Sequence, residues 1–325
     1  MDLLWSQLDE VHLCGGVFFR ARFSAPFCVE SPSCDEVADL LGAGPRRVIP
    51  FHLVADGTCE ARLDGRRPVT LNDGDVVVFL HDGPHVMASP GARGPTPIAP
   101  LLPPPPYHGV ERIELGGPGA VSRLICGFLF HDRVSFNPLL DGLPELLVVT
   151  SDAGDRGARH SRIFSLIEEE SSTARPGSGS LLARLTELLF VEVLRSYMEA
   201  MVKGDRGWLA GLRDPFVARV LRLFNDRPDH PWDLASLSRE AGLSRSALAA
   251  RFTDALGEPP MRYLTRLRMQ RASNLLEHTD LPLAGVAARV GYASEVSFNR
   301  AFRRTVGVPP ATWRRRTVGS ARAAR

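Results

Sequence analysis

The feature that most constrains the fold is a repeat near the C-terminal end of the chain. Residues 234–260 read LASLSREAGLSRSALAARFTDALGEPP, and residues 283–310 read LAGVAARVGYASEVSFNRAFRRTVGVPP. Repetition at a fixed period indicates two copies of one supersecondary unit. Gly242 and Gly291 are 49 residues apart. The later matching residues are 50 apart, because the second copy has one inserted residue: Phe252 and Phe302, Gly257 and Gly307, and the proline pairs 259–260 and 309–310.

Each copy predicts a helix, a tight glycine turn and a second helix. In the later copy, Gly291 ends the first helix and Ser294 can cap the next one. The opposite side of that second helix is polar and rich in arginine, as a helix in the major groove of DNA requires. Apolar residues one turn apart mark the side expected to be buried, namely Leu248 and Phe252 in one copy and Phe298 and Phe302 in the other.

The charge distribution supports a polyanionic partner for this end of the chain. From Arg213 onward there are 20 arginines against 10 acidic residues, whereas the preceding residues carry 19 basic and 27 acidic side chains. A basic C-terminal third behind an acidic body indicates contact with nucleic acid. Residues 261–278 are expected to form a helix that joins the two copies. Two second helices held in this way could enter successive major grooves of one duplex.

The N-terminal half has a different pattern. Residues 1 to about 10 predict a short amphipathic helix, and short β-prone runs separated by Gly, Asp, Asn or Pro follow up to about residue 150. This spacing is typical of an antiparallel barrel or sandwich. The segment 89–109 is dominated by Pro and Gly, so it is expected to be a long loop between strands. The fold class is therefore α+β, with a β domain before an all-α domain.

Residues 151–205 are expected to be helical and to link the two domains. In the helix predicted over 181–202, apolar residues form a stripe along most of its length. Two interpretations remain open, and both can hold. The helix packs on the β domain, or it pairs with its own copy in a homodimer, which we expect. The divisions predicted are therefore 1–150, 151–205, the tandem domain 210–318, and a disordered tail 319–325.

Two segments of the β domain carry the candidate effector site. Residues 71–85, LNDGDVVVFLHDGPH, and residues 50–57, PFHLVADG, resemble the two conserved motifs of the cupin barrel. Cupins place histidines from such strands around a metal or a small ligand. The usual cluster of closely spaced His residues followed by Glu is absent, so no metal or other cofactor is favoured. The histidines that match approximately, His52, His81 and His85, are assigned as effector-binding, the alternative being surface or hydrogen-bonded core histidines.

The tandem units, the connecting helix and the segment GYASEVSFNRAFRRTVGVPPATWR, residues 291–314, resemble the C-terminal DNA-binding domain of the AraC/XylS family of transcription regulators. The resemblance covers residues 210–316. The N-terminal segments CVESP, GDVVVF, CGFLF and FNPLL resemble the cupin-type sensor domain found in one branch of that family. The resemblance implies that outward positions of the two reading helices contact bases. Carried onto this chain, they are Arg245, Ser246, Ala249, Ala250, Glu295, Val296, Asn299 and Arg300.

Further arginines are candidates for phosphate contacts, which position a domain without reading sequence. They are Arg251, Arg266, Arg268, Arg303, Arg304 and Arg314. For any one of these polar residues, the alternative is a solvated helix face. Ala249 and Ala250 depart from the long polar side chains often found at their positions, so they could touch only a thymine methyl or the sugar-phosphate edge. The first reading helix is therefore expected to discriminate less between sequences, or to rely on Arg245 and Arg251.

These features predict a transcription regulator rather than an enzyme. Its expected partners are double-stranded promoter DNA, a small-molecule or redox effector, a second copy of the chain and, if it activates, RNA polymerase. The alternative is a metal-dependent cupin enzyme with a DNA-binding appendage. Five cysteines without CxxC spacing, no visible secretory signal and no long apolar run predict a cytoplasmic protein without membrane contact. Cys34, in SPSCDE, is expected to be the most exposed thiol and a possible redox switch.

Overall fold

The computed structural model describes residues 3–315, apart from 11–12, 44–45, 81, 105–106, 108, 132–135, 152–154, 174 and 203. The chain forms two compact units, and each is described by itself. The sheet unit comprises His12–Asp132 and Pro144–Ala200. The helical unit comprises Met1–Val11, Arg133–Leu143 and Met201–Arg325. The helices after residue 150 thus share a compact unit with the strands, and the tail predicted over 319–325 lies outside the described residues.

The sheet unit contains two sheets. The six-stranded sheet has the order β11-β6-β3-β10-β1-β9, and the five-stranded sheet has the order β5-β4-β7-β2-β8. Side chains of both sheets meet in one apolar core, which includes Phe19, Val29, Ala61 and Leu124. The strands are β1 (Cys14–Ser24), β2 (Cys28–Ser31), β3 (Arg47–Asp56), β4 (Cys59–Leu63), β5 (Val69–Leu71), β6 (Val76–Phe79), β7 (His85–Ala88), β8 (Thr96–Pro97), β9 (Val110–Gly116), β10 (Val121–His131) and β11 (Leu146–Val149).

The sheets are antiparallel except at two edges, where β9 runs parallel to β1 and β8 runs parallel to β2. A parallel pair needs a long connection, and the Pro-rich segment after β7 contributes to it. Over its described residues, that segment forms the two-residue edge strand β8 and the 3₁₀ turn η1 (Ala99–Leu101) and no longer element, as its prolines require. It is nevertheless packed, because Ile98, Leu102 and Tyr107 contact the core.

The predicted glycine turn before the apolar run VVVF forms around Asp75. Gly74 has a φ of 79°, and the Asp75 carboxylate accepts hydrogen bonds from the backbone amides of Asn72 at 2.8 Å and Ser151 at 2.9 Å. The following strand β6 lies between β3 and β11. All four of its residues are buried, which explains why the run is continuously apolar instead of alternating.

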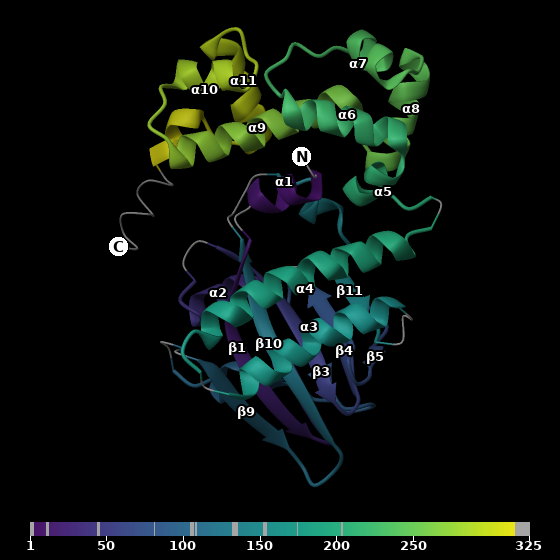
Figure 1. Ribbon diagram of the computed structural model, residues 1–325. Coiled ribbons are helices and arrows are strands. Elements are labelled where there is room, and N and C mark those ends of the chain that lie inside the picture. Colours follow the sequence, from purple (N-terminus) through teal and green to yellow (C-terminus); the bar gives the residue numbers. More distant parts are fainter. Residues whose placement is uncertain are drawn as a thin grey trace. The chain divides into compact units, whose positions relative to one another are not determined.

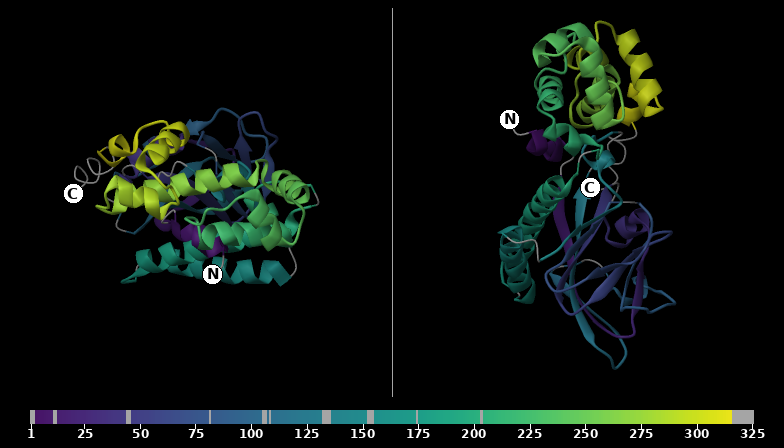
Figure 2. Two further views of the ribbon diagram at one scale, coloured as in Figure 1. Left: turned by 90° about the horizontal axis from the view of Figure 1, so that it is seen from above. Right: turned by 90° about the vertical axis from the view of Figure 1, so that its right-hand side faces the viewer.

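Helices cover the six-stranded sheet on one side. Helix α3 (Asp155–Ser172) and helix α4 (Ser178–Ala200) run side by side, and α4 contacts β1, β10 and β11 (Figure 1; Figure 2, right). Gly15 permits a close crossing, because a Cβ there would lie 2.4 Å from the carbonyl oxygen of Ala183. The expectation that this long helix packs on the β domain is confirmed. A short helix, α2 (Cys34–Leu40), packs near β3.

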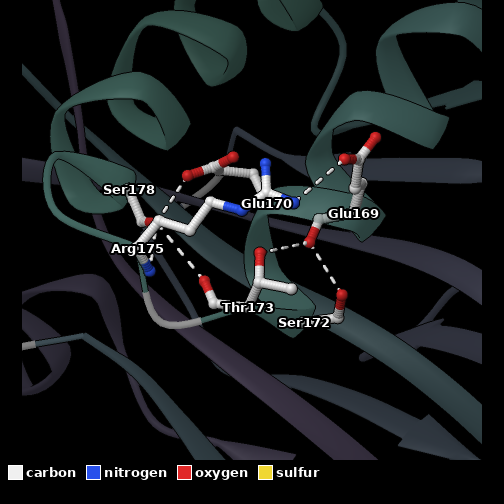
Figure 3. Close-up of polar contacts among 6 residues, drawn as sticks. All are labelled: Glu169, Glu170, Ser172, Thr173, Arg175 and Ser178. Atoms are coloured by element: carbon white, nitrogen blue, oxygen red, sulfur yellow. Dashed lines mark hydrogen bonds and ion pairs between the residues drawn. The ribbon is translucent and has the colours of Figure 1, made fainter.

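Polar contacts fix the turn between α3 and α4. The Arg175 guanidinium pairs with Glu169, and the Ser178 hydroxyl donates to the Glu170 carboxylate (Figure 3). The hydroxyls of Ser172 and Thr173 donate to the backbone carbonyl of Glu169 at 2.7 and 3.2 Å. These bonds satisfy carbonyl groups that a helix end leaves without partners, so the two helices are joined by a defined turn.

The helical unit contains the two predicted helix-turn-helix units. Helix α9 runs from one to the other (Figure 1). The first unit is built on Phe224, Phe252 and Tyr263, whose rings pack 5.7–6.2 Å apart. The helices of the whole helical unit are α1 (Leu3–Glu10), α5 (Trp208–Arg213), α6 (Pro215–Asp226), α7 (Leu234–Ala241), α8 (Arg245–Leu256), α9 (Pro260–His278), α10 (Leu283–Arg289) and α11 (Glu295–Val306).

Two segments from the N-terminal half belong to the helical unit, which the sequence did not predict. The Ser6 hydroxyl of α1 donates to Asn225 of α6 at 3.0 Å. The segment 136–143 lies beside α9, where the Phe136 ring packs against Tyr263 at 6.0 Å and beneath the guanidinium of Arg266 at 3.7 Å. Over the described residues of both units, no helix is long and apolar enough to cross a membrane.

Candidate nucleic-acid interface and sensor pocket

The two reading helices, α8 and α11, are built alike. Each begins at a serine, Ser244 or Ser294, whose hydroxyl accepts the amide hydrogen of the residue three positions on at 3.2 Å. Each ends at a glycine in the left-handed conformation, Gly257 with φ 77° and Gly307 with φ 88°. A residue with a side chain is strained in that conformation, so the glycines terminate both helices at matching points.

The side expected to be buried is buried in both helices. Leu248, Phe252, Phe298 and Phe302 are each 0% exposed, which confirms the predicted core positions. In the second unit, the two phenylalanine rings lie 5.6 Å apart and belong to a cluster with Met269, Val286 and their neighbours. This packing fixes which sides of α8 and α11 point away from the core.

Most positions predicted to contact bases lie on those outward sides. Ala249 and Asn299 are half-buried, and the other six are exposed, including Val296 at 62%. Single exposed apolar side chains are common on protein surfaces, so the exposure of Val296 is compatible with a DNA contact and does not require one. The exposed six are Arg245, Ser246, Ala250, Glu295, Val296 and Arg300.

The arginines predicted to contact phosphate differ in their surroundings. Arg303 and Arg304 are exposed on α11, and Arg251 is exposed on α8 with an ion pair to Asp214 at 3.1 Å. Arg266 pairs with Glu258 at 3.0 Å and with Asp141 at 3.4 Å. The remaining two donate to backbone carbonyls, Arg268 to Pro228 and His230 and Arg314 to Leu276 and Leu281.

The sheet unit holds a largely apolar pocket between its two sheets. The space is ≈ 580 Å³, part of it open to solvent. Side chains of both sheets line it, and Ile98 and Leu102 of the Pro-rich segment form part of its wall. Its polar groups include two of the predicted effector-binding histidines, His52 of β3 and His85 of β7. The third, His81, lies outside the described residues.

The two histidines form a hydrogen-bonded chain with Cys126 of β10. His52 Nδ1 lies 2.9 Å from Cys126 Sγ, and His52 Nε2 lies 2.9 Å from His85 Nε2. The Phe79 ring stacks on His85 with centroids 3.8 Å apart. Burial lowers the pKa of His52 to about 4 and raises the pKa of the Cys126 thiol, so near neutral pH His52 and Cys126 are both uncharged.

The sequence assigned His52 and His85 to one site but missed Cys126. Cys126 lies directly opposite His52 where β10 pairs with β3. The sequence alone does not give the register of that pairing, so it could not bring Cys126 to the site. The thiol and His85 contact opposite nitrogens of the His52 ring. One ion therefore cannot bind all three groups in this arrangement, and no group of three or more His, Cys, Asp or Glu side chains suited to a metal occurs among the residues described.

The expectation that Cys34 is an exposed thiol is wrong. Cys34 begins α2 after the Ser33 cap, and its side chain is 4% exposed within the core. Burial, with the nearby Asp82 carboxylate as a second cause, raises its pKa to about 12. The polar residues next to Cys34 in the sequence suggested that it is exposed. Two of them, Ser33 and Glu36, instead form the capping box of α2 by bonding to each other.

Comparisons with known proteins agree with this architecture. Residues 2–199 match the model of a cupin family, and residues 237–316 match a helix-turn-helix domain family. A Streptomyces lividans protein described as an AraC-like transcription regulator is 34% identical over 272 residues, which cover 83% of this chain and 87% of that protein. The chain belongs to the AraC family of transcription regulators. Its fold class, with a cupin domain before two helix-turn-helix units, is confirmed.

A further relative spans nearly the whole chain, and one solved structure covers its C-terminal part. The transcriptional regulator AlkR of Acinetobacter baylyi is 26% identical over 98% of this chain and all of its own length. The DNA-binding domain of AdpA, solved in complex with a target DNA, is 33% identical with a TM-score of 0.30 and covers 31% of this chain and 90% of that chain. This AraC-family protein is therefore a DNA-binding transcription regulator with a cupin-type sensing domain.

Proposed function

We propose that the protein controls promoters by reading DNA with α8 and α11 and by binding an uncharged, mostly apolar effector in the sheet unit. For the DNA half, the supporting observation is the matched pair of reading helices with outward polar side chains. On this proposal, Asn299 and Arg300 carry most of the base discrimination, and Val296 contacts a thymine methyl group. The exposed Arg251, Arg303 and Arg304 contact phosphates, whereas Arg266 and Arg314 support the domain.

DNA selection by the full-length protein tests this half. A pool of random duplexes should yield an asymmetric site that covers two successive grooves. Binding of that site is then measured for Arg304→Ala, which should weaken specific and unrelated duplexes alike and reduce the salt dependence by about one unit. Arg162→Gln, on α3 of the sheet unit, is the control for loss of one charge. Selection of no consensus would contradict sequence-specific reading.

For the effector half, the carrying observation is the pocket between the sheets, with the Cys126–His52–His85 chain in its wall. Its lining favours an apolar body. Because His52 is uncharged near neutral pH, this histidine offers no imidazolium to a carboxylate. Both ring nitrogens of His52 have partners, so the polar feature that fits is a hydroxyl or carbonyl group that replaces the His85 bond at His52 Nε2.

Octan-1-ol, octane and octanoate are suitable probes, because they differ only in the polar end. Thermal unfolding of the full-length protein should show more stabilisation by octan-1-ol than by octane or octanoate. His52→Phe keeps a ring but removes the nitrogens, so it should weaken octanol binding about 5- to 10-fold and leave octane binding unchanged. Thr70→Val, on the edge strand β5, is the control. Equal effects of the variant on octanol and octane would contradict the role of His52.

A second copy of the chain is the partner proposed for α3 and α4. Leu166, Leu181 and Leu188 are 46–51% exposed there, and the last two lie two turns apart on one side of α4. A double variant with Leu181→Glu and Leu188→Glu should sediment as a monomer, whereas Arg67→Gln, exposed in the loop between β4 and β5, should behave like the native dimer. A monomeric native protein would contradict this proposal. RNA polymerase is a further partner if the protein activates, which transcription from the selected site would detect.

We infer that the protein acts in regulation and not in catalysis. The relatives that match most of its length are transcription regulators, which supports this inference. The buried Cys34 thiol, with its raised pKa, is poorly suited to act as an accessible redox switch. The small-molecule effector is therefore preferred to the redox signal.

A further inference from the structure

Arg268 lies in the middle of α9, the helix that joins the two helix-turn-helix units. Its side chain does not extend into solvent as a phosphate contact would. The Nε–H group donates to the carbonyl oxygen of Pro228 at 2.7 Å, and an Nη2–H group donates to the carbonyl oxygen of His230 at 2.8 Å. The guanidinium thus uses two sides of its planar fork on one short loop, an arrangement that lysine cannot reproduce.

The loop that Arg268 holds belongs to the first unit, because it connects α6 to α7. The loop is itself well fixed. The Trp232 indole donates to the carbonyl of Arg227 at 2.9 Å, and the His230 and Trp232 rings lie 4.2 Å apart. Because the loop is fixed in this way and leads into α7, a shift of the loop would also shift α7 and the turn that precedes the first reading helix.

The other side of Arg268 faces the turn of the second unit. The guanidinium lies over the ring of Tyr292, 5.8 Å from its centroid, within the range of a cation–π contact. Gly291 leaves no spare room there, because a Cβ on it would lie 2.7 Å from Arg268 Nη2 and 2.7 Å from the carbonyl oxygen of Asp229. Tyr292 in turn packs against Phe298 of the second reading helix, with centroids 5.9 Å apart.

We propose that Arg268 is a positioning residue that fixes the spacing and orientation of the two reading helices, so that both can enter their grooves on one duplex. It is the point at which the first unit's loop, the connecting helix and the second unit's turn meet. This inference rests on the proposed two-groove reading of DNA. It differs from the prediction from sequence that Arg268 contacts phosphate, because two of its N–H donors bond to backbone carbonyls.

The mechanism is an increase in effective concentration. When one reading helix is bound, a rigid joint presents the other helix at the neighbouring groove, and a loose joint presents it only part of the time. Loss of Arg268 should therefore weaken a site that engages both helices and leave the binding of each half-site unchanged. A phosphate contact would behave differently, because its loss weakens every duplex and reduces the salt dependence.

The test uses the full-length protein and the duplex selected from random sequences. Its affinity is compared with two duplexes in which one half-site or the other is scrambled, and with a duplex that has one base pair inserted between the halves. Arg268→Ala and Arg268→Lys are the variants, the second of which keeps the charge. Arg262→Ala is the matched control, because Arg262 is exposed on the same helix and pairs only locally with Glu258, at 3.6 Å.

Both Arg268 variants should lose about tenfold in affinity for the intact site, keep native affinity for the half-sites, and tolerate the inserted base pair better than the native protein. Native half-site binding also shows that the variants are folded. The inference is overturned if Arg268→Lys binds the intact site as well as native, or if intact and half-sites weaken equally with a lower salt dependence. If the native protein binds intact and half-sites equally, two-groove reading fails first, and the inference fails with it.

Discussion

The two helix-turn-helix units share one scaffold and differ on the side that meets DNA. Serine caps, C-terminal glycines and buried apolar pairs match between α8 and α11. Where the first reading helix has Ala249 and Ala250, however, the second has Asn299 and Arg300. The comparison teaches that helix packing determines the buried side of each unit, whereas the outward side, which is mostly exposed, differs between the two copies.

The units also differ in what supports them. The core of the second is a local cluster of α9, α10 and α11 side chains. The first shares Tyr263 with Phe136 of the segment 136–143, and α1 bonds to its helix α6. Segments from the N-terminal half of the chain therefore contribute to the packing of the first unit.

The largest expected effect comes from the buried rings. Phe298→Ala and Phe252→Ala should each cost about 3–5 kcal/mol of unfolding free energy, because both side chains are fully buried. Hydrogen exchange of the full-length protein separates the units. Phe298→Ala should raise exchange within 283–310 and leave 234–260 protected, and Phe252→Ala should do the reverse. Uniform loss of protection in either variant would show that the units unfold together.

The turn glycines should respond unequally. Gly242 and Gly291 have φ values of 70° and 79°, so alanine is strained at both and should cost about 1–2 kcal/mol. A Cβ at Gly242 meets open space, whereas one at Gly291 strikes Arg268 and the Asp229 carbonyl. Overpacking should raise the total at Gly291 to about 2–4 kcal/mol. Urea unfolding measures the loss of stability in both glycine variants. Equal losses would contradict the explanation that the close approach of Gly291 to Arg268 and Asp229 makes its substitution more costly.

The difference between the outward sides of α8 and α11 is tested by Arg300→Ala. This variant should weaken binding of the selected site by about 1–3 kcal/mol and relax specificity at the contacted base. Arg245→Ala in the first reading helix should cost less, because its neighbours Ala249 and Ala250 add few polar contacts. Fluorescence anisotropy with specific and scrambled duplexes provides the measurement. A greater loss for Arg245→Ala would mean that the first helix is the main reader.

Much of this architecture was predictable from the sequence because helical repeats are local. The glycines, caps and apolar pairs of α8 and α11 lie within a few residues of one another, and their spacing was sufficient to place the units. The resemblance to AraC/XylS proteins then supplied the positions that are predicted to face DNA. The sheet unit was predicted only as a class, since strand order depends on pairings between distant segments.

The contacts that the sequence could not show are those between distant residues. Cys126 joins His52 only once β10 pairs with β3, and Arg266 meets Phe136 only once the segment 136–143 lies beside α9. Arg268 looked like its exposed neighbours, because an arginine on a basic helix gives no sign of which donors are occupied. Cys34 looked exposed because its polar neighbours cap a helix whose inner side is buried.

The smallest expected effect tests whether the two reading helices begin equally well. Ser244→Ala and Ser294→Ala each remove a hydroxyl that accepts a first-turn amide hydrogen at 3.2 Å, and each should cost about 1 kcal/mol. Ser180→Ala is the control, since this serine is exposed on the first turn of α4 and its loss should change stability by less than about 0.5 kcal/mol. Urea unfolding resolves these differences. A loss confined to Ser294→Ala would mean that the start of α8 is stabilised by the additional packing of the first unit and not by its serine cap. The two units would then differ in what stabilises their reading helices as well as in the residues on their outward sides.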